Sequence, residues 1–421
     1  MSSIVKFAKV LRRNWKKSTF FFGVLAYGAS YGIEKYKTFE MMRAYCEEAK
    51  TYGEKPLPQM TKPKHVTVIL NPQANNGKAN VRFEKFAAPL LHLAGLKVSV
   101  FQTEKEKQAQ ELMEIMSNTD AVIVAGGNGT VHEVITGLMR RPDIEDAKLP
   151  LGIIPLGRTN TVAKHLFGSN VSSEAQLMAE AAMAVIRETT VALDVMKIQY
   201  ASEEKPVFAM CSFEQGVFAD VEPKVGKYWY LGFLKDKFAY FKNSFKERKP
   251  IQNSKLEYVA PCSGCSQCYV PPKIKKKLNE NRWWSAFLPR NPHSQISDST
   301  PDYSSIINED CGKHLELKSS YSNITVSTAA VNETRRDIGG SLCIKVYPIS
   351  LSTKQFISYG LRYHRSKLSD DSISSIVKAR ELIIESTEEV DSEDAVNVEK
   401  GSEHTDEFYY IDNEKYKRAS C

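Results

Sequence analysis

The sequence predicts an α/β domain with a parallel sheet, followed by a β-rich domain and preceded by an apolar N-terminal helix. Three observations lead to this fold class. Over residues 62–190, short β-branched runs alternate with amphipathic stretches of helical length, which is typical of βαβ units. From residue 191 onward the runs are strand-like, with no long helical stretch between them. Residues 1–37 are basic and enclose a run without charge.

Composition and charge exclude several classes of protein. The 421 residues are 42% hydrophobic and 25% charged, so the chain can bury a core in each of two or three domains. The net charge is +7, and residues 1–37 carry this whole excess with eight lysines and arginines and one glutamate. A nucleic-acid-binding protein spreads such an excess over a folded face, so we expect no nucleic acid partner. Eight cysteines are too few for a disulfide scaffold.

The N-terminal segment, residues 1–37, is predicted to be a basic targeting segment and mitochondrial membrane anchor. Residues 18–33 contain no charged side chain. A bilayer span needs about 20 apolar residues, and flanking lysines and tyrosines extend the reach of this shorter run. A secretory signal anchor and a buried core helix are the alternatives. No clear cleavage site follows, so we expect the segment to be retained, and residues 38–61 are predicted to be a proline-bearing linker.

Four short runs are predicted to be the parallel strands of the α/β domain. The first, His65–Leu70, is rich in β-branched side chains and ends at Asn71-Pro72. The apolar run AVIVA at residues 121–125 has the composition of a strand buried on both faces. The other two strands are predicted at residues 96–101 and 151–155.

The stretches between these strands have the apolar spacing of helices. In residues 81–93 the apolar positions fall on one helical face, and Gly95 follows as a stop signal. Residues 104–116 and 131–140 show the same spacing. The strands are therefore expected to run parallel, with their carboxyl ends at one edge of the sheet.

Residues 191–421 are predicted to form a mostly antiparallel β-rich domain. Strand-like runs fall at residues 207–211, 341–347, 355–359 and 408–411. The stretch at about residues 249–310 is rich in Pro, Ser and Asn and is predicted to be a largely irregular insertion.

Three loops that contain glycine follow three of the predicted parallel strands, at residues 71–78, 126–130 and 155–160. In an open parallel sheet, ligands bind beyond the carboxyl ends of the strands. Glycine lets the backbone approach a phosphate, and a helix N-terminus directs N–H groups at it. A single such loop is explained equally well as a plain strand-to-helix turn, but three in register predict a phosphate-binding site. The Walker A and protein-kinase glycine motifs are absent from the sequence.

The motifs of these loops, NPxx…GKA, VAGGxGTxxEVxTG and IPLGxTN, resemble those of the diacylglycerol kinase catalytic domain family, which includes sphingosine and ceramide kinases. Within that family the segments ILNPQANNGKA and KYWYLGFLK resemble the mitochondrial acylglycerol kinases. The resemblance implies an α/β nucleotide-binding domain with a C-terminal β-sandwich (NAD kinase/diacylglycerol kinase-like). It also implies ATP in the cleft, and Mg²⁺-dependent transfer of the γ-phosphoryl group to the hydroxyl of an acylglycerol.

The resemblance assigns site residues by position. The nucleotide-contacting positions are Asn71, Pro72, Gly77, Gly126, Gly127, Gly129, Thr130 and Thr159. Thr103 matches a further ATP-contacting position, with a helix N-cap as the alternative. Asp194 matches the aspartate near the acceptor hydroxyl, with a turn residue as the alternative. Glu414 matches the family's general base. The alternative is that Glu414 is one of the many acidic residues of a solvated surface.

One motif position departs from the family pattern. The family has Gly-Gly-Asp-Gly-Thr where this chain has Asn128. The amide keeps the size of the aspartate and removes a charge and a proton acceptor. If the aspartate acts as a base, its loss costs about 10²–10⁴ in rate. Asn128 is therefore assigned to the catalytic position together with Glu414.

The resemblance also implies a place and partners. A family member of this kind lies on the mitochondrial inner membrane, faces the intermembrane space, and converts monoacylglycerol and diacylglycerol to lysophosphatidic and phosphatidic acid. The alternative is a catalytically impaired member that acts as a structural subunit of the inner-membrane carrier translocase for protein import. The expected partners are thus the acylglycerol, the membrane and the translocase subunits.

Two patterns in the insertion stay open. Cys262, Cys265 and Cys268 have the spacing C-x₂-C-x₂-C, which allows one zinc ion, a disulfide or unliganded thiols. The fourth zinc ligand would be Cys311, His293 or His314. The second C-x₂-C pair of common zinc sites is absent from the sequence, so no metal ligand is assigned. Residues 273–288 mix lysines with tryptophans, which is typical of a membrane-contacting segment or of a solvated loop.

Overall fold

The computed structural model describes residues 14–56, 63–142, 149–157, 159–168, 171–200, 205–246, 251–262, 264–268, 305–328, 341–364, 373–386, 408–411 and 414–417. The chain forms two compact units, one of residues 1–213 with 406–421 and the other of residues 214–405. The basic and aromatic stretch at 273–288 and the first thirteen residues lie outside the described residues.

The first unit is built on a four-stranded parallel sheet. Its strands are β1 (His65–Leu70), β2 (Lys97–Gln102), β3 (Ala121–Gly126) and β4 (Leu151–Pro155), in the order β2-β1-β3-β4. The register pairs Val66 with Ala121, and Val122 with Leu151. Strands β1 and β3 are buried along nearly their whole length. The apolar runs that predicted strands covered on both faces are therefore confirmed.

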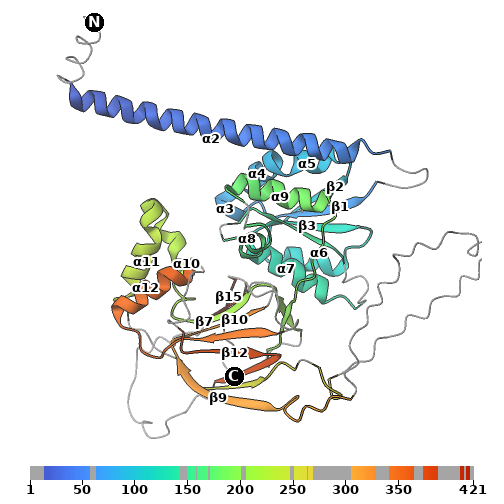
Figure 1. The fold of residues 1–421 in the computed structure, drawn as a ribbon, viewed down its shortest axis with the longest axis vertical. Coiled ribbons are helices and arrows are strands. Elements are labelled where there is room, and N and C mark those ends of the chain that lie inside the picture. Colours follow the sequence, from blue (N-terminus) through green and yellow to red (C-terminus); the bar gives the residue numbers. More distant parts are fainter. Residues whose placement is uncertain are drawn as a thin grey trace, which may run out of the picture. The chain divides into compact units, whose positions relative to one another are not determined.

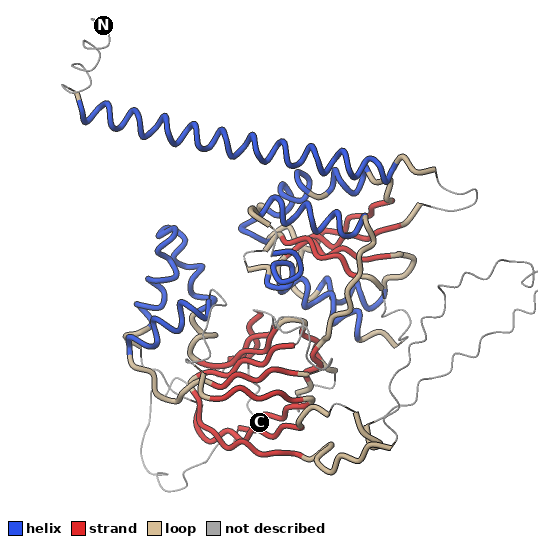
Figure 2. The backbone as a smooth tube through the Cα atoms, in the orientation of Figure 1, coloured by secondary structure: helices blue, strands red, loops and turns tan. Residues whose placement is uncertain are grey.

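Helices lie on both faces of this sheet (Figures 1 and 2). They are α3 (Ala74–Gly77), α4 (Ala79–Phe86), α5 (Ala88–Leu93), α6 (Gln108–Ile115), α7 (Asn128–Met139), α8 (Thr161–Phe167) and α9 (Glu174–Ile186). The single helix predicted over residues 81–93 is divided into α4 and α5. Pro89 lies near the start of α5, where a proline, which lacks an N–H, is compatible with a new helix but not with a continuous one.

The first unit extends beyond residue 190, where the sequence predicted a domain boundary. Strands β5 (Met196–Ile198) and β6 (Val207–Ala209) form an antiparallel pair after α9. The Thr136 hydroxyl of α7 donates a hydrogen bond to the carbonyl of Phe208 and accepts one from its N–H, both 3.2 Å long. These contacts attach the strand pair to the α/β unit.

A 39-residue helix, α2 (Trp15–Gly53), precedes the sheet. Residues 38–53, predicted to be part of a linker, belong to this helix. The prolines at residues 56, 58 and 63 favoured the prediction of a linker, but the helix is stabilised by an apolar face. Tyr45 and Ala49 lie one helical turn apart, and both pack in the core formed with α5 and α9. Among the helices that the structure describes, none is long and apolar enough to cross a membrane.

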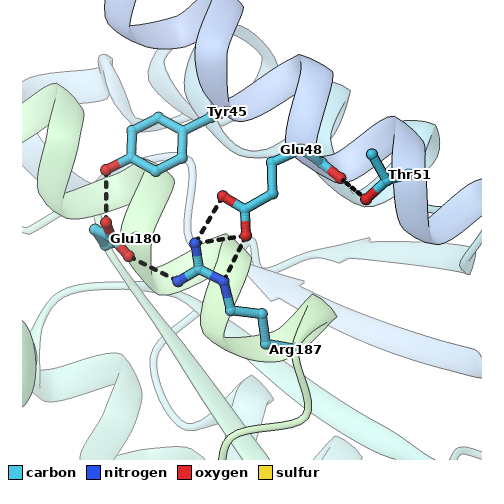
Figure 3. A network of polar contacts seen from close by, with 5 residues as sticks. All are labelled: Tyr45, Glu48, Thr51, Glu180 and Arg187. Atoms are coloured by element: carbon cyan, nitrogen blue, oxygen red, sulfur yellow. Dashed lines mark hydrogen bonds and ion pairs between the residues drawn. The ribbon is translucent and has the colours of Figure 1, made fainter.

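An ion-pair network joins α2 to α9 (Figure 3). Arg187 donates two hydrogen bonds of 2.8 Å to the carboxylate of Glu48. It also donates one of 3.2 Å to Glu180. Tyr45 donates a hydrogen bond of 2.6 Å to the other oxygen of Glu180. Burial, and then this bond, raise the pKa of Tyr45 to about 12, so the phenol remains a donor over the whole neutral range.

The strands beyond β6 form two further sheets. They are β7 (Ser212–Gly216), β8 (Ile251–Val259), β9 (His314–Tyr321), β10 (Asn323–Thr328), β11 (Leu342–Val346), β12 (Ser375–Ala379), β13 (Glu381–Ser386), β14 (Phe408–Ile411) and β15 (Glu414–Lys417). One sheet has the order β12-β11-β10-β7-β14-β15 and the other β13-β8-β9. The pairs β10–β11, β11–β12, β14–β15, β8–β9 and β8–β13 are antiparallel, as the sequence predicted.

The second unit also contains helices that the sequence did not predict. They are α10 (Glu222–Val225), the 3₁₀ helix η3 (Gly226–Leu234), α11 (Lys235–Asn243) and α12 (Thr353–His364). The strand predicted at residues 355–359 is wrong, because this segment lies in α12. Phe356 stacks on Phe218 with ring centroids 5.7 Å apart. Gly360 faces the ring of Tyr240 so closely that a Cβ would lie 2.3 Å from it. The contacts that stabilise α12 involve residues far away in the chain, in α11 and at Phe218. The five residues from which the strand was predicted do not contain this information.

The Arg187 network predicts a measurable coupling between α2 and α9. We expect Arg187→Ala to lower the free energy of unfolding by roughly 1–3 kcal/mol, because it removes charge-assisted bonds and leaves two partly buried carboxylates without their partner. Urea unfolding of Arg187→Ala, Glu48→Ala and the double variant gives the coupling energy. Arg43→Ala, which removes an exposed ion pair with Glu47 on the same helix, is the control and should cost less than about 0.5 kcal/mol. Additive single-variant effects would contradict the prediction.

Buried His132 predicts acid sensitivity of the first unit. Burial, aided slightly by Arg140 and opposed by a hydrogen bond to the Phe208 backbone, lowers the pKa of His132 to about 4. The unfolded chain therefore takes up a proton at this histidine at about pH 6.5, whereas the folded protein does so only near pH 4. The free energy of unfolding is highest above pH 6.5 and falls as the pH drops toward 4, by up to about 1.4 kcal/mol per pH unit. In His132→Gln the melting temperature should change less between pH 7 and pH 5 than it does in wild type. The same change at exposed His92 should not.

Candidate functional site

The carboxyl ends of the parallel strands meet at one edge of the sheet, where backbone hydrogen bonds join the loops that follow them. The N–H of Asn71 donates to the carbonyl of Ala125 over 3.1 Å, which joins the ends of β1 and β3. The N–H groups of Leu156 and Gly157 both donate to the carbonyl of Gly126, over 2.9 and 3.1 Å. The three glycine-bearing loops predicted to act together are thus adjacent.

Two glycines at this edge lie too close to other atoms to carry a side chain. A Cβ on Gly157 would lie 2.4 Å from the Cα of Gly127, and a Cβ on Gly126 would lie 2.6 Å from the Thr130 hydroxyl. The loops after β3 and β4 therefore approach each other backbone to backbone. This leaves a surface of main-chain groups, which is the surface that a phosphate can approach closely.

The loop after β1 has a compact left-handed conformation. Residues 75–77 have φ values of 53°, 57° and 77°, a region that asparagine and glycine tolerate best. Pro72 lies at the start of the loop, between Asn71 and Gln73. The Asn71 side-chain oxygen accepts the N–H of Gln73 over 3.0 Å, and its Nδ2 donates to the Thr130 hydroxyl over 3.1 Å. Asn71 thereby joins the first loop to α7.

Asn128 begins α7 and is only 6% exposed. Its Oδ1 accepts the N–H of Thr161 over 2.9 Å. Its Nδ2 donates to the hydroxyls of Thr161 and Thr159, over 3.0 and 3.3 Å. The side chain that replaces the motif aspartate therefore connects the second loop to the third. An aspartate could keep these contacts, because each hydroxyl can rotate to donate instead of accept.

Asn160 is a site residue that the sequence prediction missed. It has a φ of 50° at the cap position of α8, and its Nδ2 donates to the Gly157 carbonyl over 2.8 Å. Its Oδ1 is buried and has no hydrogen-bond partner within the described part of the chain. The sequence signal was an asparagine directly before a helix, the residue preferred at an N-cap.

The N-terminus of α7 presents unpaired main-chain donors. The first hydrogen bond of the helix runs from the Val131 N–H to the Gly127 carbonyl over 3.1 Å. The N–H groups of Asn128, Gly129 and Thr130 therefore have no carbonyl partner within the helix. Together with the positive end of the helix dipole, they form a surface suited to an anion.

Thr103 lies directly after β2, is 7% exposed, and donates its N–H to the Leu70 carbonyl over 2.9 Å. Helix α6 starts at Gln108 with Lys107 at the cap position, so the alternative role of Thr103 as an N-cap does not apply. Glu133 accepts the N–H of Lys107 over 3.0 Å, and burial raises the pKa of Glu133. The glutamate of the GGNGTVHEV segment thus holds the start of α6.

The cluster at the strand ends offers donors for a phosphate rather than ligands for a metal. Its side chains are the amides and hydroxyls of Asn71, Asn128, Thr130, Thr159, Asn160 and Thr161. These described side chains include no carboxylate, which is the protein group that most often binds Mg²⁺.

The two acids predicted to serve the acceptor lie on other segments. Asp194 lies in the extended, partly exposed segment between α9 and β5. Glu414 is the first residue of β15, paired in register with Ile411, and its side chain lies outside what the structure describes. Their roles remain predictions.

Two family profiles match the chain. Residues 65–198 match the diacylglycerol kinase catalytic domain, and residues 210–420 match the acylglycerol kinase C-terminal family. Mitochondrial acylglycerol kinase of Homo sapiens is 36% identical over 363 residues, which are 86% of this chain and 83% of the human protein. The chain belongs to the acylglycerol kinase family. The resemblance read from the loop motifs is confirmed, and the family is one of lipid kinases.

Other acylglycerol and sphingosine kinases are also similar to this family member. Mitochondrial acylglycerol kinase of Xenopus laevis is 43% identical over 62% of this chain and 61% of its own length. Human sphingosine kinase 1 is 32% identical over 42% of this chain and 47% of its own length. A crystal structure of a diacylglycerol kinase from Bacillus anthracis covers 85% of this chain and 92% of its own, with 18% identity and a TM-score of 0.43.

The glycine contact between the second and third loops predicts a steric effect on ATP binding. Gly157→Ala places a methyl group 2.4 Å from the Gly127 Cα, so the loops must separate at a cost of about 1–3 kcal/mol. We expect the affinity for ATP, measured by isothermal titration calorimetry, to fall roughly tenfold or more. Gly168→Ala at the end of α8, where the nearest atom is 3.8 Å away, is the matched control and should bind like wild type. Equal affinities would show that ATP does not use this edge.

Proposed function

We propose that this protein is an ATP-dependent lipid kinase that phosphorylates monoacylglycerol and diacylglycerol to lysophosphatidic and phosphatidic acid. The observation that carries the proposal is the contact of three loops at the strand ends. There, the main-chain N–H groups at the start of α7 adjoin two loops that meet backbone to backbone, an arrangement suited to a phosphate. Membership of the acylglycerol kinase family supplies the substrate class.

The residues of the site divide into two proposed roles. The N–H groups at the start of α7, with the loops that contain Asn71, Gly77 and Thr159, would hold and orient the phosphates of ATP. Mg²⁺ bound to those phosphates would supply the neutralisation of charge on which phosphoryl transfer depends. Glu414 would take the proton of the acceptor hydroxyl, and Asp194 would orient that hydroxyl.

Exposed aromatic side chains support a lipid surface as the place of reaction. In η3, Trp229 and Tyr230 are 76% and 62% exposed, whereas Tyr240 in α11 is fully buried. Lysines such as Lys242, which lies over the Tyr228 ring at 5.5 Å, alternate with these rings. Aromatic residues mixed with lysine favour the headgroup level of an anionic membrane.

We place the protein at the mitochondrial inner membrane, facing the intermembrane space. The relatives of this chain are named as mitochondrial proteins, and residues 1–37 are basic with a single acid. The N-terminal half of α2 exposes large apolar side chains, among them Phe20, Tyr27 and Ile33. Such a surface favours contact with lipid or with another protein over contact with water.

A second function is favoured by Asn128. A member without the motif carboxylate could serve as a structural subunit of the inner-membrane carrier translocase, because the amide keeps the loops joined while the charge is absent. Activity separates the two functions, since a subunit needs the fold and a kinase needs turnover.

The decisive measurement is ³²P transfer from ATP·Mg²⁺ to monoacylglycerol in mixed micelles by purified full-length protein. We expect turnover by wild type, and a fall of about 10²-fold or more in kcat for Glu414→Gln if it is the base. Glu381→Gln is the control, because Glu381 also begins a strand, β13, and is exposed. Asn128→Asp should raise kcat at an unchanged KM for ATP, because the loop contacts can persist.

Three results would change the conclusion. A silent wild type with an active Asn128→Asp variant would identify a disabled kinase and favour the translocase subunit. Silence of both, with ATP binding retained, would contradict the proposed reaction. Equal loss in Glu414→Gln and Glu381→Gln would assign the effect to folding rather than to a base.

A further inference from the structure

Four cysteines from two distant segments meet in the second unit. Strands β8 and β9 are antiparallel neighbours, and their register pairs Val259 with His314. Cys262 follows the end of β8 and Cys311 precedes the start of β9, each three residues outside this pair. The strand pair therefore carries these two cysteines to the same end, at the base of the long excursion between β8 and β9.

The sulfur atoms converge as the ligands of one ion do. The Sγ atoms of Cys262, Cys265, Cys268 and Cys311 all lie within 4.8 Å of one another. The Sγ atoms of Cys265 and Cys268 are 3.6 Å apart. In a tetrahedral site with Zn–S bonds of about 2.3 Å, neighbouring sulfurs lie about 3.8 Å apart. Several iron ions with bridging sulfides would need more room than this cage offers.

We propose that Cys262, Cys265, Cys268 and Cys311 bind one Zn²⁺ ion as a closed structural site. All four are free thiols, and the separation of 3.6 Å is far from the roughly 2.05 Å of a disulfide. Four thiolates in tetrahedral arrangement are the donor set that selects zinc. Cys311 supplies the fourth ligand, whereas the Nδ1 of His314 lies 4.0 Å from the Glu257 carboxylate.

Hydrogen bonds around the sulfurs fit bound thiolates. The backbone N–H of Cys265 donates to the Sγ of Cys268 over 3.3 Å, and the amide of Asn308 donates to the Sγ of Cys262 over 3.2 Å. The Asn308 carbonyl in turn accepts the N–H of Cys311 over 3.2 Å. Such donors orient metal ligands and share the negative charge of the thiolates. Cys265 is fully buried, and the other three cysteines are partly exposed.

The proposed zinc site would join two segments that are far apart in the sequence. The segments next to the cysteines are irregular, and one backbone bond, from the Ser266 N–H to the Ile306 carbonyl at 2.8 Å, also joins them. A metal cross-link between two segments far apart in the chain stabilises the folded state, because it closes the loop between them. The ion would hold the ends of β8 and β9 in register.

Metal content of the full-length protein, purified without chelators and measured by inductively coupled plasma mass spectrometry, tests the site. We expect about one zinc ion per chain in wild type and in the control Cys343→Ser, and a loss of at least about tenfold in Cys265→Ser. Cys343 lies in β11 of the same unit, so the control separates loss of a ligand from loss of a thiol. Cys311→His should retain zinc, because imidazole can replace a thiolate.

A second measurement on the wild-type protein tests the site even if the Cys265→Ser variant does not fold. Wild type stripped of metal by a chelator should bind one equivalent of Co²⁺ and develop the intense visible absorption of a tetrahedral cobalt thiolate, which added Zn²⁺ then removes. Iron in place of zinc, no stoichiometric metal with no cobalt spectrum, or a disulfide among these cysteines in the peptide map of unreduced protein would each overturn the proposal. None of these readouts depends on kinase activity, so the zinc site and the proposed reaction stand or fall separately.

Discussion

The close approach of Gly127 to Gly157 is the constraint on which the strand-end site depends. Because a Cβ at Gly157 would lie 2.4 Å from the Gly127 Cα, this contact requires glycine. It allows the carbonyl of Gly126 to accept two N–H groups from the third loop. It also brings the first turn of α7 beside the cap of α8, so that main-chain donors from separate loops share one surface.

Asn128 shows how such a scaffold tolerates a change in its chemistry. Its amide makes three hydrogen bonds that connect α7 to the third loop, so the contact between these loops does not need a carboxylate at this position. Catalysis has a different requirement, since a proton acceptor must carry charge or a suitable pKa. Fold and rate can therefore separate at this position.

The two units are stabilised by different means. In the first, α2 packs its C-terminal half on α5 and α9, and the Arg187 network adds orientation to that apolar contact. In the second, one core is a set of aromatic rings around Phe218, Tyr240 and Phe356. At the ends of β8 and β9, four cysteines converge instead.

The parallel α/β unit, the glycine loops and the family could be predicted from the sequence, because strand periodicity and glycine-bearing loops are local patterns that can be recognised without knowledge of contacts. It did not reveal the helix at residues 38–53, the helix α12 or the buried amide of Asn160, and it left Cys311 as one of three candidate partners of the C-x₂-C-x₂-C run. Three of these depend on a neighbour far away in the chain: α9 for α2, Tyr240 for α12, and the β8–β9 register for Cys311. Asn160 instead donates to the Gly157 carbonyl three residues before it, and its burial comes from the packing of the loops at the strand ends. A local sequence pattern does not contain this information, because burial and ligand geometry are properties of what the chain brings together in space.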